Sequence, residues 1–174
     1  MSFCYQDLIR LFEQCFAQRY NTRLVRGGDE PIYLPADNEV SYHRIVFAHG
    51  FFASALHEIA HWLLAGEQRR QQIDYGYWYC PDGRDAVQQA AFEAVEIRPQ
   101  AIEWALSASC GFAFNVSCDN LAGTVEPDRH AFKAKVREQV LVYLAHGFPE
   151  RTQLLMQALQ QHYQQPAPTA ADFN

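Results

Sequence analysis

The segment from Ala55 to Trp62 reads Ala-Leu-His-Glu-Ile-Ala-His-Trp and contains the pattern His-Glu-x-x-His. Most residues from 51 to 65 are apolar, which is typical of a helix buried on all sides. On a helix, His57 and His61 leave the same face, so both imidazoles can reach one metal ion. Glu58 occupies the position where such sites hold a carboxylate near the open face of the metal without using it as a ligand.

Two histidines and a carboxylate in an apolar helix need partners, because burying an unpaired polar group costs a few kcal/mol. A metal ion is a plausible common partner for all three. The alternative is that His57 and His61 are core residues bonded to backbone carbonyls.

A third protein ligand is needed before an open catalytic position makes sense. Glu93 and Glu96 are three residues apart in a predicted helix and are therefore neighbours on its face. We expect Glu96 to be the ligand, with Glu93 as the next candidate or as a residue that orients it. The alternative is that both are solvated surface carboxylates. Weaker candidates are Asp82, Asp85 and Asp119.

A face of two histidines and one carboxylate fits two chemistries. With zinc, a bound water of lowered pKa loses its proton to Glu58, and the enzyme hydrolyses an amide or ester. With iron(II), the same three ligands leave positions for dioxygen and substrate, and the enzyme is an oxygenase. Residue spacing does not decide between them.

The order of predicted elements indicates an α+β fold (an α/β sandwich), in which several helices pack on a small mixed sheet. Its length of 174 residues and its 49% hydrophobic content suit one catalytic domain at 1–163, followed by a mobile, proline-containing tail at 164–174. Strands are expected at 22–26, 31–35, 44–48 and 73–80. Helices are expected at 5–20, 51–65, 85–98, from Pro99 onward, 127–146 and 149–163.

Charge and cysteine usage limit the partners and the compartment. The chain has 20 acidic and 14 basic residues with no dense Lys/Arg cluster, so nucleic acid is not an expected partner. We expect no signal peptide, since the first residues lack a basic and apolar leader, and no membrane span. The five cysteines form no C-x-x-C pair, which fits a reduced cytoplasmic protein.

The aromatic segment that ends in Pro81-Asp82-Gly83 is expected to run from a strand into a loop near the metal. Substrate contacts are expected from this region at Tyr77, Trp78, Asp82 and Arg84. The alternative is an aromatic patch that only covers the core.

Several long strings of the sequence resemble the bacterial elongation factor P hydroxylase family. They span most of the chain and lie at 29–36, 44–66, 74–85, 92–100 and 114–121. The resemblance implies an enzyme that hydroxylates the β-lysyl-lysine side chain of elongation factor P. It also implies a fold like that of a zincin-type endoribonuclease, with His57, His61 and Glu96 as the metal ligands.

On this interpretation the cofactor is iron(II), although zinc or another divalent metal can occupy the purified site, and dioxygen is the co-substrate. Glu58 and Glu93 are the expected catalytic residues, through nearby charge or contacts with a substrate ammonium group. Two other hypotheses remain: a zinc hydrolase acting on peptides or RNA, and a binding module whose residues 75–79 dock a partner.

Overall fold

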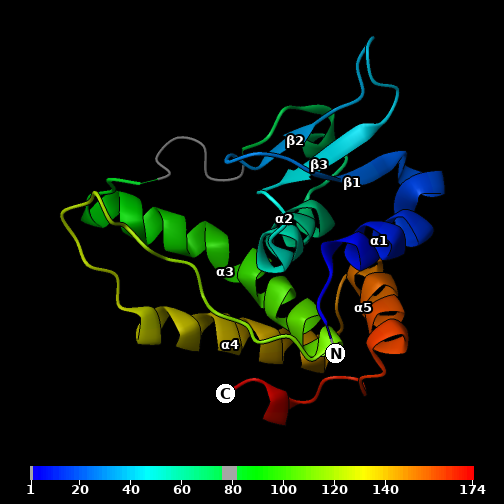
Figure 1. Cartoon of the computed structure of the whole chain (residues 1–174). Helices are drawn as coiled ribbons and strands as arrows, with labels where there is room; N and C mark the ends of the chain where they lie inside the picture. Colours follow the sequence, from blue (N-terminus) through cyan, green and yellow to red (C-terminus); the bar gives the residue numbers. More distant parts are fainter. Residues whose placement is uncertain (1, 76–81) are drawn as a thin grey trace.

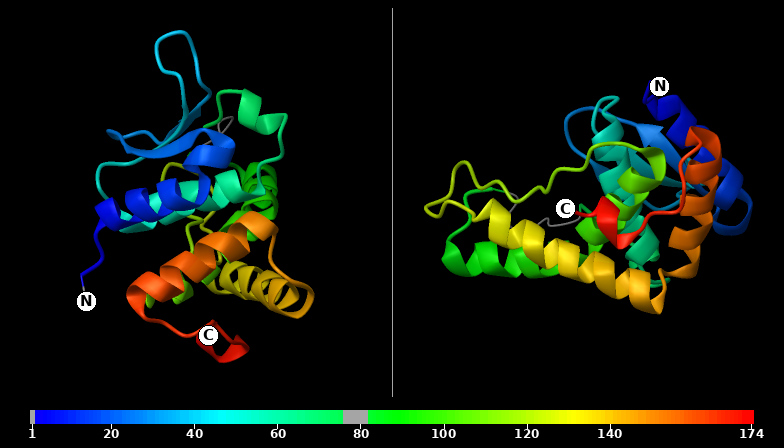
Figure 2. Two further views of the ribbon diagram at one scale, coloured as in Figure 1. Left: turned by 90° about the vertical axis from the view of Figure 1, so that its right-hand side faces the viewer. Right: turned by 90° about the horizontal axis from the view of Figure 1, so that it is seen from below.

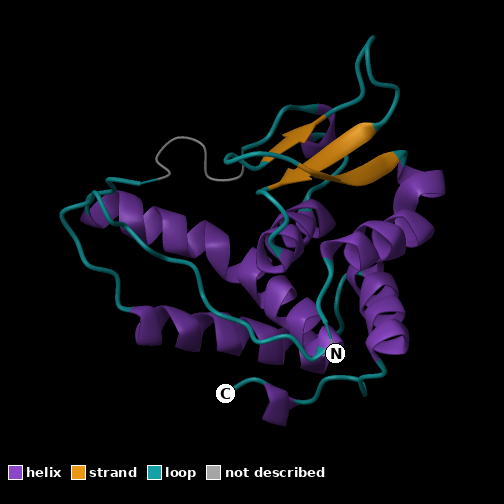
Figure 3. Cartoon of the chain, in the orientation of Figure 1, coloured by secondary structure: helices purple, strands orange, loops and turns teal. Residues whose placement is uncertain are grey.

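The computed structural model describes residues 2–75 and 82–174 and contains a small three-stranded mixed sheet (Figure 3). The strands are β1 (Thr22–Arg26), β2 (Ile32–Leu34) and β3 (His43–Phe47), in the spatial order β1-β3-β2. The central strand β3 runs parallel to β1 and antiparallel to β2. Together with the helices, this sheet confirms the predicted α+β fold of one small domain. The likeness to a zincin-type endoribonuclease stays a prediction.

The edge strand β2 lies between Pro31 and Pro35, as the sequence predicted for prolines at a sheet edge. On its outer side, the N–H of Tyr33 donates to the carbonyl of Asp74 at 2.8 Å. This pair is an isolated bridge, so the strand predicted at 73–80 is absent from its described part, 73–75. Residues 76–81 of that prediction lie outside the described residues.

Within the described residues, five α-helices lie on one side of the sheet (Figures 1 and 2). The sheet lies over α1 and α2, and α3 packs on the other side of α2 against α4 and α5 (Figure 1). Among the helices of the described residues, none has the length and apolar character needed to cross a membrane. The helices are α1 (Tyr5–Tyr20), α2 (Phe52–Leu64), α3 (Ala86–Cys110), α4 (Arg129–His146) and α5 (Glu150–Tyr163).

The helix α2 is buried between the sheet and α3, which explains its apolar composition. Leu56 and Ile59 are fully buried, and the indole of Trp62 packs against three rings of α1, those of Phe12, Phe16 and Tyr20. Its centroid lies 5.1 Å from that of Phe12 and 5.0 Å from that of Phe16. This packing fixes the rotation of α2 and therefore the direction in which its histidines point.

The helix α3 corrects the sequence-based expectation of a break at Pro99. It begins with the predicted capping box, in which Asp85 and Gln88 exchange side-chain to backbone hydrogen bonds, and then continues through Pro99 to Cys110. Proline removes one helical N–H, which would pair with the carbonyl of Val95. Val95 is 51% exposed, so water can solvate that side of the helix. The turns on either side of Pro99 thus belong to one helix.

The last residues of the chain pack on α3 and α4. Phe173 is fully buried, and its ring centroid lies 5.5 Å from that of Trp104. Lys133 donates from Nζ to the carbonyl oxygen of Asn174 at 2.7 Å. The domain boundary at 163 and the mobility of 164–174 stay predictions, and Phe173 is the residue through which they can be tested.

Of the described cysteines, Cys110 and Cys118 are buried, and Cys4 and Cys15 are half-buried. Cys4, Cys15, Cys110 and Cys118 form no disulfide. Cys80 lies outside the described residues.

Candidate metal centre

Side chains from α2 and α3 meet at one point. His57 and His61 leave α2 on the same face, and their Nε2 atoms lie 3.1 Å apart. Glu96 of α3 reaches both: its Oε1 lies 3.0 Å from Nε2 of His61, and its Oε2 lies 3.7 Å from Nε2 of His57. The two histidines have the predicted i, i+4 geometry, and Glu96 is the carboxylate that lies next to both of them.

Glu103, one to two turns after Glu96 on α3, holds the far side of His57. Nδ1 of His57 donates to Oε2 of Glu103 at 2.7 Å. This bond places the proton on Nδ1 and leaves Nε2 as the nitrogen that faces Glu96 and His61. Metal-binding histidines commonly donate their other N–H to a carboxylate, which orients the ring and raises its basicity.

Gln100 orients Glu96 and ties it to the loop after α3. Nε2 of Gln100 donates to Oε2 of Glu96 at 3.0 Å and to the carbonyl of Ser117 at 2.7 Å. In return, the N–H of Ser117 donates to Oε1 of Gln100 at 2.9 Å. Both the histidine and the carboxylate side of the cluster are therefore positioned by further polar residues.

The electrostatics match a site for a cation. Burial alone would lower the pKa of His57, but the neighbouring charges of Glu103 and Glu96 raise the pKa to about 10. Burial alone would raise the pKa of Glu96, but the charge of His61 and its hydrogen bond lower the pKa to about 2. Negative charge at Glu96 and Glu103 thus favours a positive charge between these side chains.

The donor set fits a divalent transition metal. His57, His61 and Glu96 each offer one ligand atom, and these atoms all lie within 4.8 Å of one another. Two imidazole nitrogens and one carboxylate oxygen suit zinc or iron(II), and three protein ligands leave room for further ligands.

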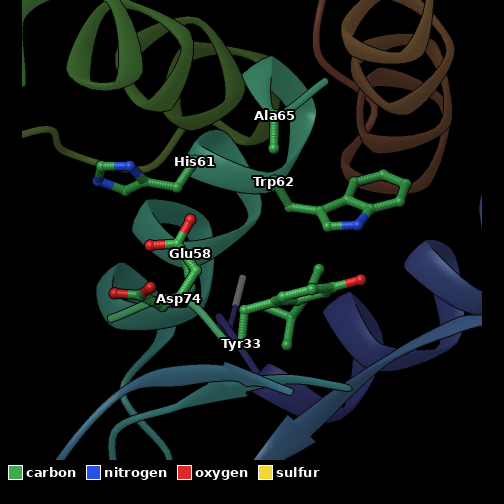
Figure 4. Close-up of a pocket in the computed structure, with 7 residues that line it drawn as sticks. Tyr33, Glu58, His61, Trp62, Ala65 and Asp74 are labelled. Carbon is green, nitrogen blue, oxygen red and sulfur yellow. The ribbon is translucent and has the colours of Figure 1, made fainter. Parts of the chain in front are cut away.

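Glu58 and Glu93, the expected catalytic residues, lie on the two helices that form the cluster. Burial raises the pKa of Glu58, and the charges of His57 and His61 oppose that rise. Its carboxylate lines a pocket together with His61 (Figure 4). Glu93 is half-buried on α3 and is not one of the three grouped ligands. The catalytic roles of both residues stay predictions.

The expected substrate contacts divide into two groups. Tyr77 and Trp78 lie outside the described residues. Asp82 is exposed and accepts from the N–H groups of Gly83 and Ala122. Arg84 is 1% exposed and its guanidinium stacks on the ring of Phe92, 3.8 Å from the centroid. Both described residues thus hold the segment before α3, and their contact with substrate stays a prediction.

The weaker ligand candidates have structural roles elsewhere. Asp85 caps α3, and Asp119 forms an ion pair with Arg129 at 2.6 Å.

Sequence reasoning missed Gln100 and Glu103. A signal was available, because Glu96, Gln100 and Glu103 are spaced by four and three residues, as neighbours on one helix face are. The predicted helix break at Pro99 placed Glu96 in one helix and Gln100 and Glu103 in the next, so this shared face was not recognised.

Comparisons with known proteins indicate the family to which the chain belongs. A family model described as elongation factor P hydroxylase matches residues 11–173. A protein of Haemophilus influenzae named elongation factor P lysine hydroxylase is 54% identical over 158 residues, which cover 91% of this chain and 88% of that protein. The resemblance noted in the sequence is therefore confirmed, and this chain belongs to the elongation factor P hydroxylase family.

Proposed function

We propose that this chain is an enzyme that hydroxylates elongation factor P on the lysine carrying a β-lysyl group. The observation that carries the proposal is the cluster of His57, His61 and Glu96 in a chain of this family. The relative from Haemophilus influenzae is named for hydroxylation of a lysine of that factor, and at 54% identity its activity is a sound guide to this chain.

We further propose that the metal is iron(II) and the co-substrate dioxygen. Bound iron would supply the oxidising chemistry that places one oxygen atom of dioxygen in a C–H bond of the side chain, while a two-electron reductant converts the other oxygen atom to water. The chain contributes a rigid set of ligands: Glu103 keeps Nε2 of His57 free for the metal, and Gln100 keeps Glu96 aimed at it. Zinc or another divalent metal can bind the same donors.

The acidic residues near the cluster suit a cationic side chain. Glu58 lies beside both histidines in a half-buried position, where water screens its charge less than that of an exposed carboxylate. We propose that Glu58 and Glu93 attract and orient the ammonium groups of the substrate. A zinc hydrolase that uses Glu58 as its base is the rival assignment, and the family does not favour it.

A substrate that serves in translation places the enzyme in the cytoplasm, with a protein rather than a nucleic acid or a membrane as its partner. This setting is part of the proposal.

The test is mass spectrometry of the lysylated factor after coexpression with the enzyme. The wild-type enzyme is expected to add one oxygen atom, and His57→Ala to add none. His130→Ala, which removes an exposed histidine at the start of α4, is the matched control and should leave the oxygen gain intact. No gain with the wild type, or full gain with His57→Ala, would overturn the proposal.

Repeating the assay with purified enzyme decides the metal. The metal-free protein should regain hydroxylation with ferrous iron under oxygen. Peptide or RNA hydrolysis restored by zinc, with no hydroxylation restored by ferrous iron, would instead support the hydrolase.

A further inference from the structure

A small pocket opens beside the metal-binding residues and shares His61 with them (Figure 4). Its volume is about 30 Å³, which accommodates a group or two of the size of a water molecule or an ammonium head. Its walls come from the sheet, from α2 and from the segment after η1 (Arg69–Gln71). The lining residues are Tyr33, Ile45, Glu58, His61, Trp62, Ala65 and Asp74.

One wall of the pocket is acidic. The carboxylates of Glu58 and Asp74 lie on the same side of it as the His61 ring (Figure 4). The backbone bridge between Asp74 and Tyr33 fixes Asp74 against β2. Arg69 forms an ion pair with the Asp74 carboxylate. Arg69 is half exposed, so its charge is screened by solvent more than that of the partly buried Glu58.

The other wall is aromatic. Tyr33 and Trp62 lie across from the carboxylates, and the Tyr33 hydroxyl donates to the carbonyl of Arg70 at 2.8 Å, which holds its ring in place. Aromatic faces attract cations and pack against methylene groups, so an acidic wall facing an aromatic wall suits an alkylammonium group.

The indole N–H of Trp62 supplies an independent indication of a polar ligand. Trp62 is 3% exposed, and its Nε1 has no hydrogen-bond partner within the described part of the chain. The nitrogen lies on the ring edge that faces Tyr33 (Figure 4). Buried N–H groups are nearly always paired, so this donor favours a ligand that carries an acceptor oxygen beside the aromatic wall.

We propose that this pocket binds the aminoacyl end of the substrate's modified lysine, with an ammonium group at Glu58 and Asp74 and the amide oxygen near the indole N–H of Trp62. The inference rests on the proposed function and extends it: Tyr33, Trp62 and Asp74 become residues that distinguish the lysylated side chain from an unmodified lysine. Because the pocket shares His61 with the metal centre, a group seated there holds the rest of the side chain beside the metal.

The experiment measures binding and needs no turnover. Purified factor, either lysylated or unmodified, is titrated calorimetrically into metal-loaded enzyme without oxygen. The wild-type enzyme should bind the lysylated form more tightly, and Asp74→Asn should reduce that preference by about tenfold while leaving the affinity for the unmodified form unchanged. Trp62→Phe, which removes the N–H and keeps an aromatic wall, should reduce the preference by a smaller factor.

Arg69→Gln is the matched control, since it breaks the ion pair and leaves the Asp74 carboxylate in the pocket. It should preserve the preference, and thermal unfolding should show that all variants fold. The proposal is overturned if Asp74→Asn weakens the binding of both forms of the factor equally, or of neither. It is also overturned if Arg69→Gln reduces the preference for the lysylated form as much as Asp74→Asn does. Failure of wild-type enzyme to add oxygen in the mass assay would be a separate result that contradicts the proposed function.

Discussion

Among single residues, Glu103 has the clearest effect on the candidate metal centre because it determines which nitrogen of His57 faces His61 and Glu96. Removing its carboxylate in Glu103→Ala frees the ring to turn and lowers its basicity. We expect the affinity for the metal to fall by about 10- to 100-fold, as measured by competition with a chelator. Glu103→Gln keeps an acceptor for Nδ1–H and should recover part of the loss.

An equal loss in both Glu103 variants would mean that charge, and not orientation, is the contribution of this residue. No loss in either would show that the bond to His57 is dispensable. Glu126→Ala, an exposed glutamate of the loop before α4, serves as the control for a generic change in charge.

Replacing Gln100 should reduce both the metal affinity and the stability of the fold. Gln100→Ala removes the donor to Glu96 and leaves the carbonyl and N–H of Ser117 without their partner. Because Gln100 is fully buried, we expect the free energy of unfolding to fall by about 1–3 kcal/mol in urea titrations. Metal affinity should fall as well, and unchanged stability would contradict the role of Gln100 as the link to this loop.

Among the helices, α3 shows what local patterns reveal and what they conceal. The pairing of His57 with His61 and the capping box of Asp85 were predictable because each depends on a spacing within one turn of helix. Glu103 was not, because Pro99 suggested a helix end. The face that Glu96 and Glu103 share exists only when the helix continues across the proline.

The start of α3 offers a test of stability that is separate from metal binding. Asp85 accepts from the N–H of Gln88 at 2.8 Å, and Gln88 accepts from the N–H of Asp85 at 3.0 Å. Asp85→Ala should lower the free energy of unfolding by about 1 kcal/mol, while Asp85→Asn should cost less. The metal affinity should stay unchanged because Glu96 lies three turns further along α3. A lower metal affinity in Asp85→Ala would show that fraying reaches the site.

For the molecule as a whole, the sequence indicated the layers of the fold, and its expectation of a mobile tail stays a prediction. Proline spacing identified β2 as an edge strand, and apolar runs identified β3 and α2 as buried elements. Small residues and prolines in the last segment predicted a mobile tail, yet local composition contains no information about Trp104, which lies distant in sequence and contacts Phe173.

Phe173→Ala tests whether that contact stabilises the domain. Truncating a fully buried phenylalanine to alanine lowers the free energy of unfolding by about 3 kcal/mol or more. If the tail is firmly packed, urea unfolding of Phe173→Ala should show a loss of that size. Faster proteolysis within 164–174 should accompany the loss. Unchanged stability and proteolysis would instead support the mobile tail that the sequence predicted.

The proposed metal should link two helices, since His57 and His61 come from α2 and Glu96 comes from α3. A ligand that binds only the folded state stabilises it by about 2.7 kcal/mol when present at 100 times its dissociation constant. Removing the metal with a chelator should therefore lower the midpoint of thermal unfolding, and adding ferrous iron or zinc back should restore it. His61→Ala should abolish the response to added metal, whereas His130→Ala should retain it. A wild-type protein whose unfolding is indifferent to metal would show that these three residues do not bind it in the folded state.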